Sequence, residues 1–308
     1  MTSETTTVNA ADGIALHTYR WEPEAPAKAV VQIAHGMAEH AGRYARFAAA
    51  LNDAGYAVYA EDHRGHGQTN PVGSGHGYFA DETGFDTVVE DLYAVSERIR
   101  QDHPTLPLFL FGHSMGSFLS RAYAARHGDD LAGLILSGTA GDQGLLGKAG
   151  AAIAALEIKV RGRTVRSPLM NTLTFGQYNR AFAPKRTDFD WLSRDPAEVD
   201  AYVADPLCGN VFTTGFFADL LAGLDGINNK ATIAKVPPSL PIQLIAGSLD
   251  PVGAGGKGVL QVAEQYRAAG VEDVSLHLYI GARHEVLNET NRDEVTADVI
   301  AWLDNHLQ

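Results

Sequence analysis

The feature that most constrains the fold of this chain is a short turn, bracketed by glycines, between an apolar run and a helix-like segment. Gly112-His113-Ser114-Met115-Gly116 follows the apolar residues 108–111 and precedes residues 118–126, whose apolar spacing is helical. Gly112 and Gly116 have no Cβ where a strand and a helix crowd together, so the central residue can adopt strained backbone geometry. The pattern predicts a sharp strand-turn-helix junction that holds the Ser114 hydroxyl out at the strand tip.

The composition is that of a folded globular protein and argues against two kinds of partner or site. Of the 308 residues, 45% are hydrophobic and 20% are charged, which are ordinary values. The formal net charge of −13 repels a phosphate backbone, so we expect no nucleic-acid partner. Cys208 is the only cysteine, which excludes an intrachain disulfide and a metal site built on several thiolates.

The N-terminal residues and the longest apolar runs bear on location. The first seven residues have neither the basic start nor the apolar core of a signal peptide. No run approaches the ~18 apolar residues of a membrane span. We therefore expect a cytoplasmic protein without stable membrane insertion.

Short apolar runs separated by helix-like stretches predict a mostly parallel sheet that is covered on both faces. Residues 6–10 and 14–21, joined by Asp12-Gly13, predict an antiparallel hairpin. Central strands are expected at 30–34, 57–60, 106–111, 131–136, 242–246 and 274–280, and covering helices at 44–54, 85–101, 118–126, 256–269 and 292–307. This alternation predicts an α/β fold with a doubly wound sheet.

The alternation stops between about residues 140 and 236, where only helix-like segments such as 149–158, 171–182 and 216–224 are evident. An insertion of this length between core strands, at the edge where such sheets bind ligands, predicts a helical cap. We therefore expect three parts, which are a first core part at 1–139, a cap or lid at 140–236 and a second core part at 237–308. A separate domain unrelated to the site is the alternative. The segment 149–158 is apolar enough either to line an acyl pocket or to be an ordinary buried helix.

A serine hydroxyl is a poor nucleophile at neutral pH, so Ser114 needs a base and a residue that orients the base. Asp250 and His284 suit these roles, because each closes a loop that directly follows a predicted strand. Parallel strands bring such loops to one edge of the sheet. Asp219 and Asp225 are weaker alternatives to Asp250, since their segment is helical.

Developing negative charge on an acyl substrate also needs hydrogen-bond donors. The Met115 N–H, next to the nucleophile, is one expected donor, and the loop 35–40 should supply the other. Gly36 permits close approach to a substrate, which points to the Met37 N–H. Loop residues expected to shape the site are His35, Gly36, Gly112, His113 and Gly116, with His63, His66 and His76 in further loops.

Two expectations concern neighbouring groups. Glu285, next to the base, is expected to make a local hydrogen bond or to lie at the surface. The cluster Asp62-His63-Arg64-Gly65-His66-Gly67 lacks zinc-ligand spacing, so we expect no metal and no cofactor.

Taken together, these motifs resemble the monoacylglycerol lipase and lysophospholipase group of α/β-hydrolases, which is also labelled serine aminopeptidase-like (S33). The matching pieces span most of the chain and are residues 35–44, 62–69, 112–116, 250–252 and 281–285. The resemblance implies the α/β-hydrolase fold and a catalytic triad in the chain order Ser114, Asp250, His284. Ser117 stands where a further glycine is frequent in the group, and the cap sequence matches no particular member.

The resemblance implies a serine carboxylic-ester hydrolase that works through an acyl-enzyme. Expected partners are small-molecule esters, namely monoacylglycerols, lysophospholipids or other short to medium acyl esters, with a transient lipid contact through the cap; the oligomeric state stays open. Alternatives are a peptidase or C–C hydrolase with the same triad, or a non-catalytic binding protein of this fold. A peptidase would need carboxylates in the cap to hold the free amino terminus of its substrate. The cap offers an acidic run that could do so, or that could instead form a solvated helix face: Asp188, Asp190, Asp195, Glu198 and Asp200.

Overall fold

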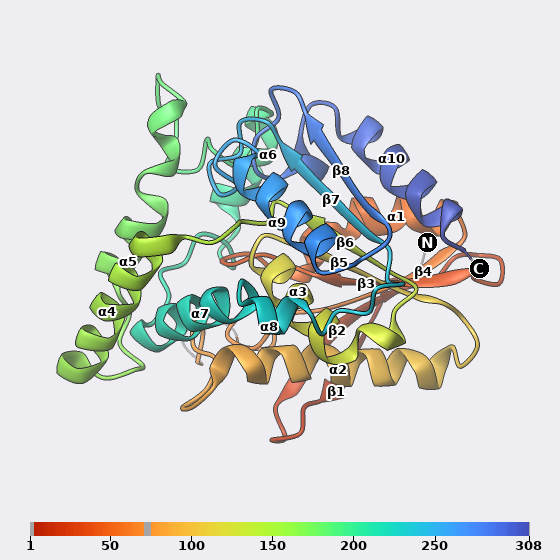
Figure 1. Cartoon of the computed structure of the whole chain (residues 1–308), viewed down its shortest axis with the longest axis horizontal. Coiled ribbons are helices and arrows are strands. Elements are labelled where there is room, and N and C mark those ends of the chain that lie inside the picture. Colours follow the sequence, from red (N-terminus) through yellow and green to blue (C-terminus); the bar gives the residue numbers. More distant parts are fainter. Residues whose placement is uncertain (1–2, 71–74, 308) are drawn as a thin grey trace.

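A single twisted sheet organises the molecule (Figure 1). The computed structural model describes residues 3–70 and 75–307. The sheet has eight strands in the order β1-β2-β4-β3-β5-β6-β7-β8. Pairing is antiparallel between β1, β2 and β4 and parallel from β4 through β8. The strands are β1 (Ser3–Asn9), β2 (Ala15–Trp21), β3 (Ala29–Ala34), β4 (Tyr56–Glu61), β5 (Leu108–His113), β6 (Gly133–Ser137), β7 (Ile242–Gly247) and β8 (Val274–Tyr279).

The predicted hairpin and all the predicted central strands are confirmed, with ends that differ by a few residues. Gly13 has φ +87° in the hairpin turn, a conformation that a side chain would disfavour. Strands β3, β4, β5 and β7 are buried along their whole length. Continuous burial explains why their sequences are apolar runs rather than alternating patterns.

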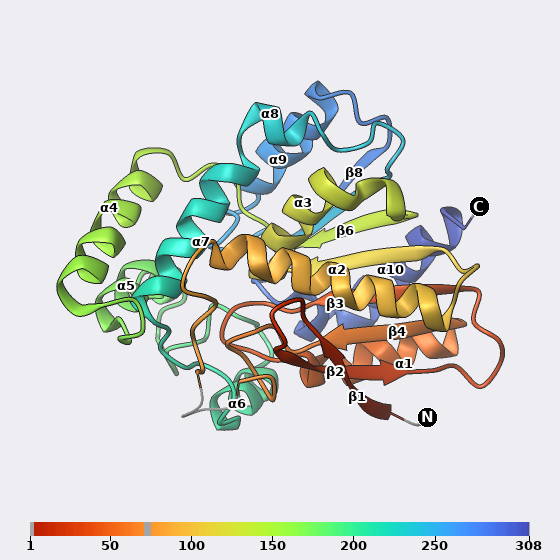
Figure 2. The same ribbon diagram turned by 90° about the horizontal axis from the view of Figure 1, so that it is seen from below.

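Helices cover both faces of the sheet (Figure 2). One face packs against α2 (Gly84–Asp102), α3 (Met115–His127) and α9 (Lys257–Ala268). The other face packs against α1 (Ala45–Asp53) and α10 (Arg292–Asn305). These helices were all predicted, and the doubly wound α/β architecture is confirmed.

The chain between β6 and β7, residues 138–241, is called here the β6–β7 segment. It contributes no strand to the sheet, and every one of its residues is described. Its helices α4 and α5 project away from the sheet (Figure 1). The helices are α4 (Gly144–Arg161), α5 (Pro168–Phe175), α6 (Pro196–Ala204), α7 (Thr214–Ile227) and α8 (Lys230–Ile233), with a 3₁₀ turn, η3, at Tyr178–Ala181.

Two expectations within this segment were wrong. Residues 171–182 do not form one helix, because α5 ends at Phe175 and the chain re-enters helical geometry only in η3. The helix α4 is not an ordinary buried helix. It packs against α7 and buries only Ala154, while its exposed apolar side chains include Leu145, Leu146, Leu156 and Val160.

Candidate active site

Ser114 sits in a strained junction between β5 and α3. Its φ of 52° and ψ of −119° are rare for a residue with a side chain. A Cβ on Gly116 would lie 2.0 Å from the Ala34 carbonyl oxygen, so only glycine permits this approach of helix to sheet. Ser117, which replaces a frequent glycine, donates from its hydroxyl to the Ser114 carbonyl at 2.6 Å. The junction therefore has the strand-turn-helix form that the sequence predicts.

Asp250 and His284 lie in direct contact. Asp250 follows β7 and His284 follows β8, and the His284 Nδ1 is 3.0 Å from the Asp250 Oδ2. Both side chains are buried. Burial lowers the pKa of His284, but the charge of Asp250 and its hydrogen bond outweigh burial, so the pKa lies above the ordinary value of 6.5. The structure thus brings together the predicted base and its partner.

The alternative acids lie elsewhere. The Asp219 carboxylate is paired with Arg163 at 2.8 Å, and Asp225 is exposed. Neither residue lines the pocket that contains Ser114. Asp250 is therefore the carboxylate positioned to orient His284.

Ser114 and His284 line one pocket beneath the β6–β7 segment. The core contributes the loop 36–39 and His113, and the segment contributes apolar and aromatic side chains. The rings of Trp191 and His284 have centroids 5.0 Å apart. The backbone N–H of His284 donates to the Trp191 carbonyl at 3.3 Å. No residue of α4 lines this pocket, so the structure does not support the acyl-pocket alternative for 149–158. The segment's lining residues are Asn171, Phe175, Phe189, Trp191, Leu192, Tyr202, Gly209 and Asn210.

The loop 36–39 lies beside the serine, and its first backbone donor is already occupied. Gly36 lies against Ser114, since a Cβ on Gly36 would be 3.2 Å from the Ser114 Cβ. The Gly36 N–H already donates to Glu39 Oε1 at 2.6 Å. Among the described residues the N–H groups of Met37 and Met115 have no protein acceptor. These are the two donors that the sequence predicts.

Ala38 holds this loop against the β6–β7 segment. Its φ of 59° is in the left-handed region, which non-glycine residues rarely adopt. The Ala38 carbonyl accepts the Tyr202 hydroxyl at 2.8 Å and the Gly209 N–H at 2.9 Å. The segment therefore fixes the conformation of the loop that carries the Met37 donor.

The loop histidines form a buried cluster next to this loop. The His35 ring stacks on the His63 ring with centroids 4.1 Å apart. The backbone N–H of His63 donates to His35 Nε2 at 2.9 Å. Burial and the neighbouring histidines hold the pKa of His35 well below 6.5, so it is neutral. His66 packs edge-on against His35, and His76 Nδ1 contacts the Asn70 carbonyl at 2.9 Å.

His113 precedes the serine in the chain, and its ring contacts the ring of His284. Its ring centroid is 4.7 Å from that of His284. Burial and the proximity of His284 lower the pKa of His113 to about 4, which makes it uncharged at neutral pH.

A buried ion-pair network behind the pocket was missed by the sequence analysis. Arg43 donates to both carboxylate oxygens of Glu285, at 2.7 and 2.8 Å, and to Glu39 at 2.5 Å. Glu285 is thus a buried hydrogen-bonding residue and not a surface residue. Burial raises its pKa but Arg43 lowers it further, to about 2. The spacing of Glu39 and Arg43, four residues apart, was the available signal.

Comparison with known proteins identifies the family. The family model described as "Serine aminopeptidase, S33" matches residues 25–291. The chain belongs to this family. It is 34% identical over 289 residues to a monoacylglycerol lipase of Mycolicibacterium smegmatis, covering 93% of this chain and 92% of that protein. It is 30% identical over 291 residues to the monoglyceride lipase of Homo sapiens, covering 94% and 85% of the two chains.

Solved structures agree with the fold. A highly thermostable carboxyl esterase from Bacillus coagulans, in complex with glycerol, has a TM-score of 0.93 at 31% identity, with 100% of both chains covered. A soluble variant of Saccharomyces cerevisiae monoglyceride lipase, in complex with a substrate analog, has a TM-score of 0.79 at 25% identity, with 99% and 95% covered. The chain is therefore an α/β-hydrolase similar to monoacylglycerol lipases, and it is a serine carboxylic-ester hydrolase.

The helices were also compared with the length and hydropathy of a membrane span. Within residues 3–70 and 75–307, no helix is both long and apolar enough to cross a bilayer.

Proposed function

We propose that Ser114, His284 and Asp250 form the catalytic triad of this ester hydrolase. The contact of 3.0 Å between His284 and Asp250, in a pocket that also contains Ser114, carries the proposal. His284 accepts the Ser114 proton as the hydroxyl attacks the ester carbonyl, and later returns it to the leaving alcohol. Asp250 holds the proton of His284 on Nδ1, so that Nε2 is the accepting nitrogen. Water then hydrolyses the acyl-enzyme with His284 as its base.

The N–H groups of Met37 and Met115 are proposed to stabilise the oxyanion of the tetrahedral intermediate. Glu39 occupies the Gly36 N–H, which leaves Met37 as the donor of that loop. The neighbouring loop residues His35, Gly36 and His113, with Gly112 and Gly116, set the backbone positions of these donors. Fixed donors of this kind act without reorganising during the reaction.

The proposed substrates are monoacylglycerols, lysophospholipids or other short to medium acyl esters. Relatives named monoacylglycerol lipase or monoglyceride lipase support this class. The pocket supports it too, because the β6–β7 segment lines it with Phe175, Phe189, Trp191 and Leu192, which suit an acyl chain.

Residues 140–236 are proposed to act as the cap over this pocket, between core parts at 1–139 and 237–308. The exposed apolar side chains of α4 support a transient contact with a lipid surface. Leu145 and Leu146 are 84% and 82% exposed, and folding alone gives no reason to present them to water.

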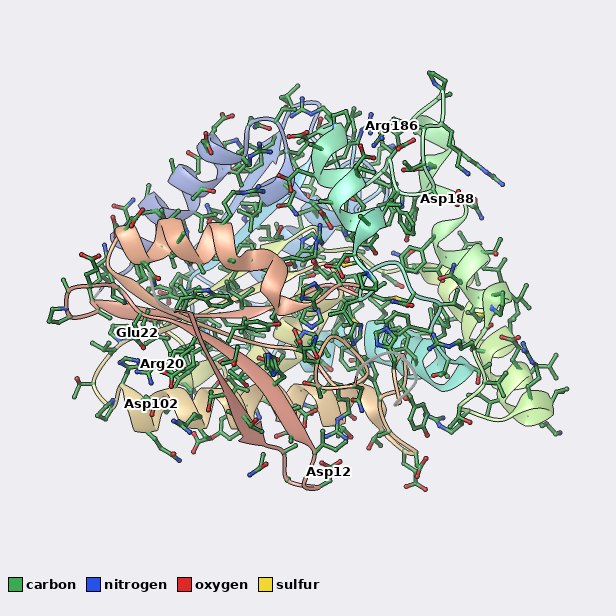
Figure 3. All side chains as sticks on the ribbon, turned by 180° about the vertical axis from the view of Figure 1, so that it is seen from behind. Asp12, Arg20, Glu22, Asp102, Arg186 and Asp188 are labelled. Carbon is green, nitrogen blue, oxygen red and sulfur yellow. The ribbon has the colours of Figure 1, made fainter. Side chains whose placement is uncertain are left out.

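A peptidase is the second candidate, because the family model carries the description serine aminopeptidase. The acidic run of the segment does not favour it. Asp190 accepts hydrogen bonds from the backbone N–H groups of Arg186 and Thr187, and Asp195 pairs with Arg292. Arg186 and Asp188, which Figure 3 labels, are both exposed. None of these carboxylates lines the pocket, so none is placed to hold a substrate amino group.

Replacing the proposed nucleophile tests this function. Ser114→Ala should lower kcat for p-nitrophenyl esters and monoacylglycerols by at least about 10⁴-fold and abolish labelling by a fluorophosphonate probe. Ser239→Ala is the matched control and should keep the wild-type activity, because Ser239 is exposed and does not line the pocket. Wild-type rates in Ser114→Ala, or absence of labelling in the wild type, would reject the triad. Faster turnover of amino-acid anilides than of glycerol monoesters would favour the peptidase.

A further inference from the structure

The fold brings His40, Asp205 and Cys208 together beside the oxyanion loop. The His40 Nε2 is 2.9 Å from the Asp205 Oδ2. One ligand-type atom from each of the three residues lies within 4.8 Å of the others. His40 precedes the 3₁₀ turn η1 (Ala41–Tyr44), whereas the other two residues follow α6, so the cluster joins the core to the β6–β7 segment.

The local structure holds these groups in place. Asp205 ends α6 and its Oδ1 accepts the Leu207 N–H at 2.9 Å, which leaves Oδ2 turned toward His40. The Cys208 N–H donates to the Asp205 carbonyl at 3.1 Å. The side chains of His40 and Asp205 are 12% and 29% exposed, and Cys208 is buried. The cluster is thus ordered, and solvent reaches it from the side of Asp205.

The chemistry of the three groups selects one class of ion. Imidazole nitrogen, thiolate sulfur and carboxylate oxygen are the protein ligands of Zn²⁺, commonly with water in a fourth, tetrahedral position. Ca²⁺ and Mg²⁺ prefer oxygen ligands throughout. We propose that His40, Asp205 and Cys208 bind Zn²⁺. The sequence analysis predicts no metal because His40 is 165 positions from Asp205, a separation that the spacing rules for zinc ligands do not cover.

The proton balance of binding is simple. The Cys208 thiol releases its proton to solvent as the Zn–S bond forms. His40 would bind the metal through Nε2 and Asp205 through its carboxylate oxygen. The thiol proton of Cys208 is therefore released when Zn²⁺ binds.

The charges around the cluster favour a cation. Arg43 is the nearby cation, and its guanidinium is already bonded to Glu39 and Glu285. The carboxylates of Glu39, Glu285 and Asp205 thus outnumber the single guanidinium of Arg43.

The site would connect two parts of the catalytic pocket. Gly209, next to Cys208, donates to the Ala38 carbonyl in the loop that presents the Met37 N–H. A bound Zn²⁺ would tie His40, in the same loop, to the end of α6. The inference does not depend on the triad, so Ser114→Ala should bind Zn²⁺ as the wild type does.

The test uses the full chain and measures binding directly. Zn²⁺ competition with a chromophoric chelator should give one ion and one released proton for each chain. Co²⁺ should give a thiolate-to-metal charge-transfer band in the near ultraviolet. Because losing even an outer-sphere partner typically costs about 10–100-fold in affinity, Cys208→Ser, Asp205→Asn and His40→Gln should each weaken binding by at least about tenfold.

Control variants separate this site from the surface histidines. His277→Gln alters a half-exposed pair, with Nδ1 3.7 Å from Asp298, and should leave binding unchanged. Cys208→His should keep Zn²⁺ but lose the cobalt charge-transfer band. A wild type without that band, or a Cys208→Ser variant with wild-type affinity, would overturn the proposal. The wild-type cobalt spectrum decides even where a ligand variant fails to fold.

Discussion

Ser114 combines a strained backbone with a fixed hydrogen-bond environment. A non-glycine residue in such a region costs about 1–3 kcal/mol and persists only where its surroundings hold it. Here the Ser114 N–H donates to the Ser137 carbonyl at 2.8 Å, and Ser117 binds the Ser114 carbonyl. The hydroxyl is therefore presented to the pocket by a backbone that has little freedom to rotate away.

Asp250→Asn should change both the rate and its pH dependence. In the proposed mechanism the neutral form of His284 is the base, so wild-type activity should fall as the pH drops through a pKa that lies above 6.5. Without the Asp250 charge, the effect of burial dominates and lowers the pKa of His284. The acid limb of the pH–rate profile, where activity falls as the pH drops, should then move to lower pH. The wrong tautomer should also reduce kcat by about 10⁴-fold.

The measurement is kcat/KM for a soluble ester between pH 5 and 9, compared with Asp219→Asn as a control. Asp219 lies outside the pocket, so its variant should keep the wild-type limb. An acid limb that stays in place in Asp250→Asn would show that Asp250 does not control His284.

At the scale of elements, burial decided what the sequence could predict. Strands such as β3 and β5 are buried on both faces, so their apolar runs were unambiguous. In the β6–β7 segment α5, α6 and α8 have only 8, 9 and 4 residues, so their sequences carry little periodic signal. A helix face was one interpretation of the acidic run 188–200, but the bounds of α6 were not predicted, although Asp195 caps it and Pro196 starts it, a recognisable N-terminal pattern. Gly176, directly after α5, was the signal that 171–182 is not one helix.

Helix α4 carries a prediction about the physical form of the substrate. Leu145→Ser combined with Leu146→Ser should lower the rate on emulsified monoacylglycerol several-fold, because two exposed apolar side chains no longer reach the lipid surface. The same variant should keep its kcat/KM for a short, water-soluble ester, since α4 does not line the pocket. Serine at two exposed helical positions should leave the fold intact, which circular dichroism would check. Equal losses on both substrates would contradict a role in lipid contact.

Across the whole molecule, buried charges join loops that are far apart in the sequence. Parallel strand order placed Asp250 and His284 at one edge, which is why the candidate triad could be predicted from chain order. The pairing of Arg43 with Glu285 spans 242 residues, and no local pattern encodes it. A cap at this edge was predicted from the length and place of the insertion, but the hydrogen bond from the Tyr202 hydroxyl to the Ala38 carbonyl was not, because the two residues are 164 positions apart.

The Arg43 network predicts how stability depends on pH. The pKa of Glu285 falls from 4.5 to about 2 in the folded protein. A carboxyl group whose pKa is lowered by folding stabilises the folded protein at pH values above its unfolded pKa. This stabilisation, about 3 kcal/mol for Glu285, is lost as the pH falls toward 2. Denaturant unfolding between pH 2 and 7 should show a shallower pH dependence for Glu285→Gln than for the wild type. Parallel curves for the two proteins would contradict this linkage.

The two hydrogen bonds on the Ala38 carbonyl have a kinetic consequence. Tyr202 and Gly209 make them, and both residues also line the pocket. If the segment moves away from this loop to admit a large ester, both hydrogen bonds must break, and the loop that carries the proposed Met37 donor is then no longer held. On the proposed mechanism, a large ester would therefore enter in one state and be cleaved in another, and the rate of closing would set an upper limit on its turnover.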